Sequence, residues 1–106
     1  MKILFVCTAG RQRSPTAADL YSERGHKTQY AGIHAIGKDA VTQKKLDWAD
    51  VIVTMEDVHR EFIERLFPKY FREKTIQVLH IPDMYENHDP ELEKIILRQM
   101  SAIDIV

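Results

Sequence analysis

The chain has few of the residues that build covalent frameworks or flexible linkers: one cysteine, four glycines and four prolines among 106 residues. A single cysteine excludes an internal disulfide and argues against a zinc site made of thiolates. With no repeat and no linker-like segment, we expect one domain over residues 1–106. The apolar runs are too short to span a bilayer, and the stretch before Cys7 is too short for a signal peptide. We therefore expect a cytoplasmic protein with no membrane partner.

Charge of neither sign dominates the sequence. Fifteen lysines and arginines face sixteen aspartates and glutamates, which gives a formal net charge of −1. A nucleic-acid-binding domain needs a clearly basic surface, so we expect no nucleic-acid partner. The hydrophobic fraction of 44% and the charged fraction of 29% are typical of soluble globular proteins. The oligomeric state is left open.

Apolar and polar residues alternate in a pattern that predicts strands and helices in turn. The predicted strands cover residues 2–6, 28–34, 51–55 and 76–81. The predicted helices run from a Ser14 cap with Pro15 at the first position to Gly25, over residues 39–48, from about Asp57 to Pro68, and from Asp89 onward. Residues 69–74 are interpreted as a solvated connector. Expected core stripes are Val58, Phe62 and Leu66 on one helix, and Leu92, Ile95, Ile96 and Ile103 on another.

This alternation of apolar strands with helices predicts an α/β fold with a four-stranded parallel sheet between two helical layers. Ligands in such folds bind beyond the carboxyl ends of the strands. Residues 7–14 follow the first predicted strand, and residues 82–89 follow the last one. We therefore expect these two distant segments to meet at one site.

The segment from Cys7 to Ser14 has the composition of an anion-binding loop. Thr8, Ala9 and Gly10 are small, so the backbone can curl with its N–H groups pointing inward, and the following helix adds a positive end. Such donors favour the thiolate form of a cysteine at the start of the loop. Six residues after Cys7, Arg13 offers a planar fork that can hold two phosphate oxygens. Ser14 can hydrogen-bond the sulfur.

Cys7 followed by five residues and then Arg13-Ser14-Pro15 resembles the low-molecular-weight protein tyrosine phosphatases. Three more stretches are similar to that family: residues 30–32, a second strand with a small-residue end; residues 49–56, a third strand and its acidic residue; and residues 81–85, an acid loop. The resemblance implies the three-layer α/β/α architecture of that family, phosphatase I-like, in a shortened member.

The family's chemistry implies a role for each matching residue. Cys7 would attack phosphorus and form a cysteinyl-phosphate, while the backbone of residues 8–13 and Arg13 would hold the phosphoryl oxygens. The substrate-binding loop would then comprise Thr8, Ala9, Gly10, Arg11, Gln12, Arg13 and Ser14. No metal or organic cofactor is required. The implied substrate is a phosphorylated protein or a small aryl phosphate, with phosphotyrosine foremost and phosphoarginine as a related possibility.

Two aspartates compete for the role of general acid. Asp89 precedes Pro90 and an apolar-periodic helix, which is typical of a helix cap. Asp83 follows a predicted strand and has Tyr85 two residues on, the spacing of the family's acid loop. We therefore assign Asp83 as general acid and base, and Tyr85 as an aromatic lining of the pocket.

The chain departs from the family pattern at several positions. Gly10 stands where the family has asparagine, Gln12 where many members have a second cysteine, and Met84 where the acid loop has proline. The stretch between the second and third strands is also short. Arg11 adds a second positive charge to the loop, which would suit an additional acidic group on the substrate.

Other functions compete with hydrolysis. A cysteine phosphocarrier shares the position of the cysteine but needs neither Arg13 nor Asp83. An arsenate reductase needs further cysteines, which this chain lacks. A catalytically weak phosphate-binding module is compatible with Gly10. The five histidines show no metal-binding spacing and are interpreted as solvated or structural.

Overall fold

The computed structural model describes residues 1–103, and its strands and helices alternate along the chain. The strands are β1 (Lys2–Cys7), β2 (Lys27–Gly32), β3 (Val51–Thr54) and β4 (Thr75–Val78). The α-helices are α1 (Arg13–Ser22), α2 (Gln43–Trp48), α3 (Asp57–Leu66), α4 (Pro68–Glu73) and α5 (Pro90–Ser101). A short 3-10 helix, η1 (Gly37–Asp39), follows β2. None of the helices within residues 1–103 combines the length and apolar content needed to cross a bilayer.

The strands form one parallel sheet in the order β2-β1-β3-β4. The predicted α/β fold with a four-stranded parallel sheet is therefore confirmed. β1 lies in the interior of the sheet, and its residues from Ile3 to Cys7 are all buried. Such an unbroken apolar run is what a strand covered on both faces requires.

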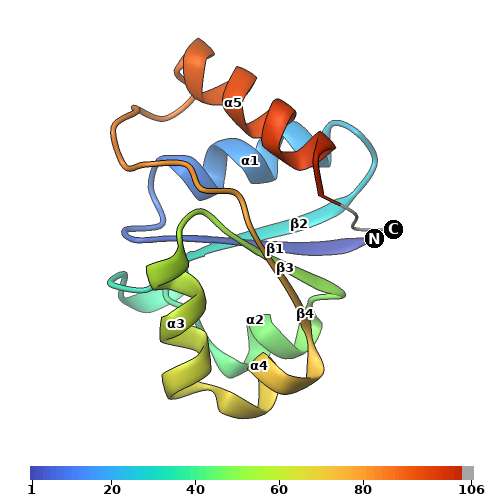
Figure 1. Ribbon diagram of the computed structural model, residues 1–106, viewed down its shortest axis with the longest axis vertical. Coiled ribbons are helices and arrows are strands. Elements are labelled where there is room, and N and C mark those ends of the chain that lie inside the picture. The colour runs from blue at the N-terminus through green and yellow to red at the C-terminus, as the bar shows by residue number, and fades with distance from the viewer. Residues whose placement is uncertain (104–106) are drawn as a thin grey trace.

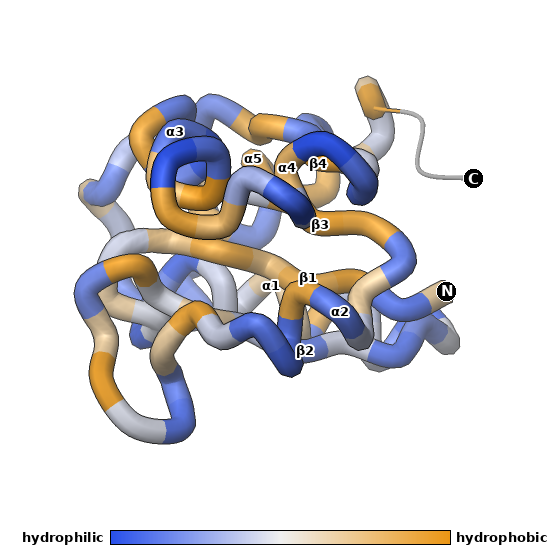
Figure 2. Tube along the Cα trace, turned by 90° about the horizontal axis from the view of Figure 1, so that it is seen from below, coloured by the Kyte–Doolittle hydropathy of each residue, from blue (hydrophilic) through white to orange (hydrophobic). Residues whose placement is uncertain are grey.

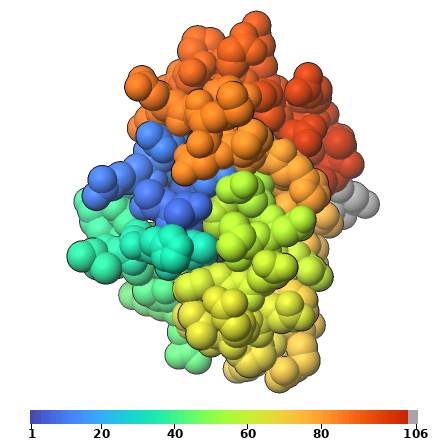
Figure 3. Space-filling view, turned by 60° about the vertical axis from the view of Figure 1, so that its left-hand side comes forward, coloured from blue at the N-terminus to red at the C-terminus, as the bar shows by residue number. Residues whose placement is uncertain are grey.

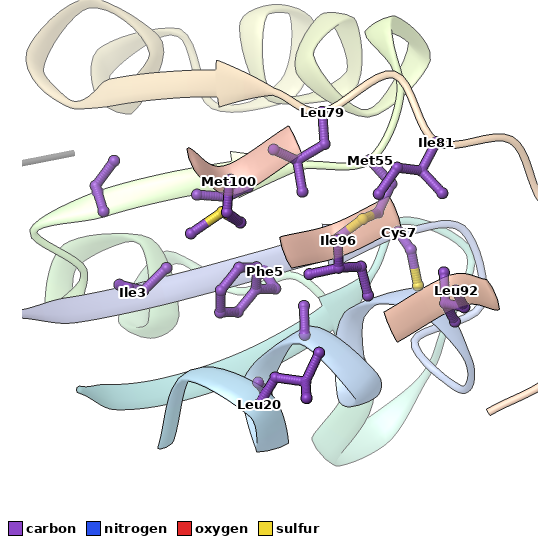
Figure 4. Packing of buried hydrophobic residues seen from close by; sticks show 14 residues of the cluster. Ile3, Phe5, Cys7, Leu20, Met55, Leu79, Ile81, Leu92, Ile96 and Met100 are labelled. Atoms are coloured by element: carbon purple, nitrogen blue, oxygen red, sulfur yellow. The ribbon is translucent and has the colours of Figure 1, made fainter. Parts of the chain in front are cut away.

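Helices cover both faces of the sheet, α1 and α5 on one side and α2, α3 and α4 on the other (Figure 1). In Figure 2 the central strands β1 and β3 are largely hydrophobic, whereas the helices carry both hydrophilic and hydrophobic residues. Successive side chains of a strand point to opposite faces, so β1 supplies both cores. Phe5 and Cys7 join the cluster beneath α1 and α5, in a row with Leu92 and Ile96 (Figure 4), whereas Leu4 packs on the opposite face.

The first helix begins two residues earlier than the sequence pattern predicts. Its N-cap is Gln12, which makes no side-chain capping bond, and Arg13 is the first helical residue. The prediction that Ser14 caps this helix is therefore wrong. The Ser14 hydroxyl instead lies 2.9 Å from the sulfur of Cys7, because the first helical turn faces the loop.

The expected core stripe of α3 is wrong at two of its three positions, and only Phe62 packs against the core. Val58 and Leu66 are about half exposed, and the buried positions are His59 and Ile63. A pattern based on apolar residues assigns histidine to the surface, but His59 has hydrogen-bond partners on both ring nitrogens and is fully buried.

Two further segments differ from expectation. Residues 69–73 belong to α4 rather than to a solvated connector, and Tyr70 of this helix is buried against the core. β4 ends at Val78 rather than at Ile81. The backbone of His80 has a φ of +57°, which interrupts the strand, although the N–H of Ile81 still bonds to Met55 O at 2.8 Å.

The last helix begins as predicted. Asp89 is the N-cap of α5, and its carboxylate accepts a hydrogen bond from the backbone N–H of Glu91 at 2.9 Å. Asp89 is thereby engaged in capping, as predicted, whereas the role of Asp83 as general acid stays a prediction. Of the expected stripe, Leu92 and Ile96 are buried, and Ile95 and Ile103 pack at the edge of the core.

Candidate active site

The loop between β1 and α1 surrounds the sulfur of Cys7. Cys7 is the last residue of β1 and is 3% exposed. Its Sγ lies 2.9 Å from Ser14 Oγ and accepts a hydrogen bond from the backbone N–H of Gly10 at 3.2 Å. Ser14 Oγ also lies 3.3 Å from the carbonyl oxygen of Ala31. The hydroxyl has one proton, so a thiolate at Cys7 would draw that proton away from Ala31 and toward sulfur.

Four backbone N–H donors of this loop have no acceptor in the part of the chain that the structure describes. Within residues 1–103, the N–H groups of Thr8, Ala9, Arg11 and Gln12 have no hydrogen-bond acceptor. Successive free N–H groups at the start of a helix form a concavity with partial positive charge. The loop can therefore hold a tetrahedral anion directly in front of Cys7.

Gly10 adopts the conformation that this curled loop requires. Its φ is +69°, a left-handed conformation that glycine adopts freely and that asparagine tolerates better than most residues. A glycine where the family has asparagine therefore preserves the backbone path of the loop. Side-chain contacts made by Thr8 and Arg13, described below, attach the loop to the rest of the protein.

The loop lies directly against the end of β2. A Cβ atom added to Gly32 would come within 2.4 Å of Gly10 N and 2.5 Å of the Ala9 carbonyl carbon. No side chain fits there without displacing the backbone of the loop. The backbone N–H of His34 also donates to Thr8 O at 2.8 Å. Gly32 therefore allows the second strand to support the loop from behind.

Arg13 is a buried cation held by several acceptors. Its side chain is 1% exposed, and Nη1 donates to Glu56 Oε2 at 2.6 Å and to the carbonyl oxygen of Ile81 at 2.8 Å. Glu56 follows β3, and Ile81 follows β4. The guanidinium thus connects the carboxyl ends of three strands, and these contacts prevent its plane from rotating.

The other terminal nitrogen of Arg13 lies between the loop and residues 82–89. Nη2 donates to Thr8 Oγ1 at 3.2 Å and lies 3.8 Å from Asp83 Oδ2. Asp83 is 53% exposed, so its carboxyl group is accessible from solvent. The predicted meeting of residues 7–14 with residues 82–89 is confirmed, and Figure 3 shows the loop recessed between the 82–89 segment, the start of α3 and the segment after β2.

His59 connects the loop to the segment after β3. Its Nδ1 accepts a hydrogen bond from the backbone N–H of Glu56 at 2.9 Å, and its Nε2 lies 2.9 Å from Thr8 Oγ1. Burial, together with the nearby positive charge of Arg13, lowers the pKa of His59 from 6.5 to about 4. The imidazole is therefore neutral, with its proton on Nε2.

Residues 87 and 88, which follow the predicted acid Asp83, contact α1 and α5. The backbone N–H of His88 donates to Thr16 Oγ1 at 2.9 Å, and this hydroxyl also lies 2.8 Å from Asn87 Oδ1. The His88 ring bridges Asp19 at 2.7 Å and Glu93 at 2.9 Å. Hydrogen bonds to Glu93 and Asp19 raise the pKa of His88 above its usual value. These contacts hold residues 87 and 88 close to the helix that begins at the loop.

The remaining predicted site residues lie at different depths. Arg11 and Ala9 are exposed and line a pocket of about 300 Å³ with His34 and Ile36. Gln12 is half-buried. Tyr85 is half-buried and packs against the core cluster of α1 and α5, so its stacking on a substrate stays a prediction. Met84 is 70% exposed.

Sequence reasoning overlooked His59, Glu56 and Gly32 as components of the site. Glu56 stands in the matched acidic position after the third strand, but its contact with Arg13 joins residues 43 positions apart. His59 has no distinctive spacing to Thr8. The small-residue end of the second strand, Ala31-Gly32, and the acidic position after the third strand were the features of the sequence that could have indicated Gly32 and Glu56.

Comparisons with known proteins place this geometry in a structural class. No protein-family model matches the sequence, and no curated protein matches it. Solved structures do match. Wzb from Vibrio vulnificus, in complex with benzylphosphonate, superposes with a TM-score of 0.77 at 23% identity, covering 95% of this chain and 94% of that one. A low-molecular-weight protein tyrosine phosphatase from T. tengcongensis gives 0.68 at 17% identity, covering 97% and 99%.

The chain has the low-molecular-weight protein tyrosine phosphatase fold. The YwlE arginine phosphatase from Geobacillus stearothermophilus shares it too, with a TM-score of 0.71 at 22% identity, covering 95% of this chain and 91% of that one. Structures with this phosphatase fold thus include enzymes named for two different phosphorylated amino acids, and identities near 20% leave the substrate of this chain open.

We expect Gly32→Ala to disrupt the loop. The added methyl group must displace the loop backbone, and overpacking of this kind costs about 1–3 kcal/mol. Gly25→Ala is the control for phosphate affinity: its φ of +91° makes alanine strain the backbone and lower stability as well, but a Cβ there meets no atom within 4 Å and so leaves the loop in place. Urea unfolding measures both variants, and titration with inorganic phosphate reports on the loop. Gly25→Ala should keep the phosphate affinity of the wild type; unchanged affinity in Gly32→Ala would contradict the close approach.

We expect His59 to make the protein less stable in acid. Its pKa is about 4 when folded and near 6.5 when unfolded, so the unfolded chain binds the extra proton. The contribution of neutral His59 is complete above pH 6.5 and is lost as the pH falls toward 4. His59→Gln removes the titrating group, so its free energy of unfolding should fall less over this interval. Parallel curves for the two proteins would show that His59 is not buried in neutral form.

Proposed function

We propose that this protein is a phosphomonoesterase that works through a cysteinyl-phosphate on Cys7. The observation that carries the proposal is the convergence of a buried thiol, free backbone donors and a clamped arginine on one small concavity. Asp83 stands beside it, 3.8 Å from Arg13. A nucleophile, an anion cradle and a proton donor are the parts that phosphoryl transfer to sulfur needs.

In the first step the Cys7 thiolate attacks phosphorus and the bond to the leaving oxygen breaks. The loop N–H groups and Arg13 hold the three equatorial oxygens, while Asp83 donates its proton to the leaving oxygen. In the second step the Asp83 carboxylate takes a proton from water, which attacks phosphorus. The sulfur–phosphorus bond breaks, its electron pair returns to Cys7, and inorganic phosphate leaves. The Ser14 hydroxyl donates to sulfur and eases this departure.

An aromatic leaving group suits the rim of the site. Exposed apolar side chains are few, and three of them, Ile36, Val58 and Met84, lie on the segments that flank the loop. They offer apolar contacts to a ring held in front of Cys7. Wzb, whose fold matches, is described in complex with benzylphosphonate, an aromatic phosphonate. These features support phosphotyrosine or a similar aryl phosphate as the substrate.

Phosphoarginine is the second candidate, favoured by the charge on one side of the site. A pocket of about 350 Å³ is lined by Glu56, Asp57, Val58, His80 and Pro82. Glu56 is paired with Arg13, but Asp57 is exposed and could face a guanidinium. Matched peptides carrying phosphotyrosine or phosphoarginine separate the two substrates. Preference for phosphoarginine that is lost in Asp57→Asn would favour this candidate.

The proposal is tested with p-nitrophenyl phosphate at mildly acidic pH. Wild type should release p-nitrophenol, and Cys7→Ser should retain phosphate binding with no measurable turnover. Arg13→Lys should lose at least about 10²-fold in kcat/KM, because lysine cannot hold two oxygens of the transition state. Phosphate binding without turnover by the wild type would leave a phosphate-binding module. A stable phosphocysteine formed from a phosphohistidine donor would instead indicate a phosphocarrier.

Replacement of Asp83 tests the proton donor. We expect Asp83→Asn to lower kcat/KM on a phosphotyrosine peptide about 10²-fold or more, because the tyrosine oxygen leaves poorly without a proton. The loss on p-nitrophenyl phosphate should be much smaller, since its leaving group needs little protonation. Asp89→Asn is the matched control, because asparagine caps α5 as well as aspartate does. Equal losses on the two substrates would remove Asp83 from the leaving-group step.

A further inference from the structure

The hydroxyl of Thr8 contacts two other residues of this site. Thr8 directly follows Cys7, and its Oγ1 lies 2.9 Å from His59 Nε2 and 3.2 Å from Arg13 Nη2. The same Arg13 nitrogen lies 3.8 Å from Asp83. The hydroxyl is thus placed between the nucleophile, the buried cation and the acid.

The direction of these hydrogen bonds follows from the backbone. The N–H of Glu56 can only donate, so His59 Nδ1 must accept, and the single proton of the neutral ring is on Nε2. His59 therefore donates to Thr8 Oγ1. Arg13 has no acceptor atom, so it also donates to Thr8 Oγ1. Both bonds arrive at the same oxygen.

A hydroxyl oxygen has two acceptor positions and one proton to donate. His59 and Arg13 fill both acceptor positions of Thr8, so its O–H points away from both of them. Within residues 1–103 the Thr8 hydroxyl makes no third hydrogen bond that could take this proton. The burial that lowers the pKa of His59 to about 4 keeps this arrangement intact at mildly acidic pH.

We propose that Thr8 is a catalytic residue whose hydroxyl donates a hydrogen bond to a phosphoryl oxygen, and that His59 is the positioning residue that orients it. The inference rests on the proposed phosphatase function. Without the His59 donor, one lone pair of Thr8 would be free, and the hydroxyl could rotate to present that lone pair to the phosphoryl oxygen. The hydrogen bond from His59 thus makes Thr8 the donor in its contact with the phosphoryl oxygen.

Thr8→Val tests the donor, since valine keeps the shape and removes the hydroxyl. We expect inorganic phosphate to bind about 10- to 100-fold more weakly, as for the loss of one donor to a charged group, with a similar fall in kcat/KM on p-nitrophenyl phosphate. Thr8→Ser should remain within a few-fold of wild type. Thr28→Val is the control, because the Thr28 hydroxyl bonds only to the Ala18 carbonyl in the described chain.

Phosphate affinity is measured by calorimetry in the Cys7→Ser background, so it needs no turnover. A wild type that fails to hydrolyse p-nitrophenyl phosphate would defeat the proposed function, whereas the Thr8 comparison would still be decided by binding. If Thr8→Val does not fold, Thr8→Ala provides the same comparison. Phosphate affinity in the folded variant within twofold of the Thr8 protein would overturn the proposal.

His59 is tested with a matched pair of substitutions. In His59→Gln the amide can accept from Glu56 and donate to Thr8, so phosphate affinity and kcat should stay near wild type. In His59→Leu both the phosphate affinity and kcat, calculated per folded protein, should fall by up to about tenfold. A purely structural role would lower the melting temperature in both variants and leave the phosphate affinity of the folded protein unchanged, and that result would overturn the positioning role.

Discussion

The buried guanidinium of Arg13 is the interaction on which the rest of the site depends. A charge that is 1% exposed needs hydrogen-bond acceptors, and here Glu56, the Ile81 carbonyl and Thr8 accept from three of its five N–H donors. Removing Glu56 would leave the buried cation without its carboxylate partner, which is destabilising. The ends of β1, β3 and β4 must therefore stay in register for the cation to be stable. The same contacts hold the guanidinium where a phosphoryl group would bind.

The loop around Cys7 is held from behind by the sheet itself. Gly32 brings β2 into backbone contact with the loop, and Gly10 supplies the left-handed turn that closes it. The free N–H groups are consequently preorganised, because their positions follow from strand packing rather than from their own hydrogen bonds. Thr8, which contacts His59 and Arg13, attaches the same loop to the rest of the site.

Local signals predicted much of the architecture. β-branched runs and capping residues predicted the strands and the start of α5, since these depend on neighbours a few residues away. Spacing along the chain predicted that Cys7, Arg13 and Ser14 act together. The start of α1 and the buried face of α3 were missed, because Ser14 and His59 use their polar atoms to bond the loop. Hydrophobic periodicity cannot detect a buried histidine whose ring nitrogens are both paired.

The sequence by itself determined the fold class, the position of the loop after the first strand and the capping role of Asp89, because each depends on short-range chemistry or on the capping preference of one residue. Only the tertiary structure decided which groups surround Arg13, how Gly32 supports the loop, and which way the protons on His59 and Thr8 point. The contacts of Gly32 with the loop, of His59 with Thr8, and of Glu56 and Ile81 with Arg13 join residues 22 to 68 positions apart in the chain. They arise only when the parallel strands bring their carboxyl ends to one edge of the sheet.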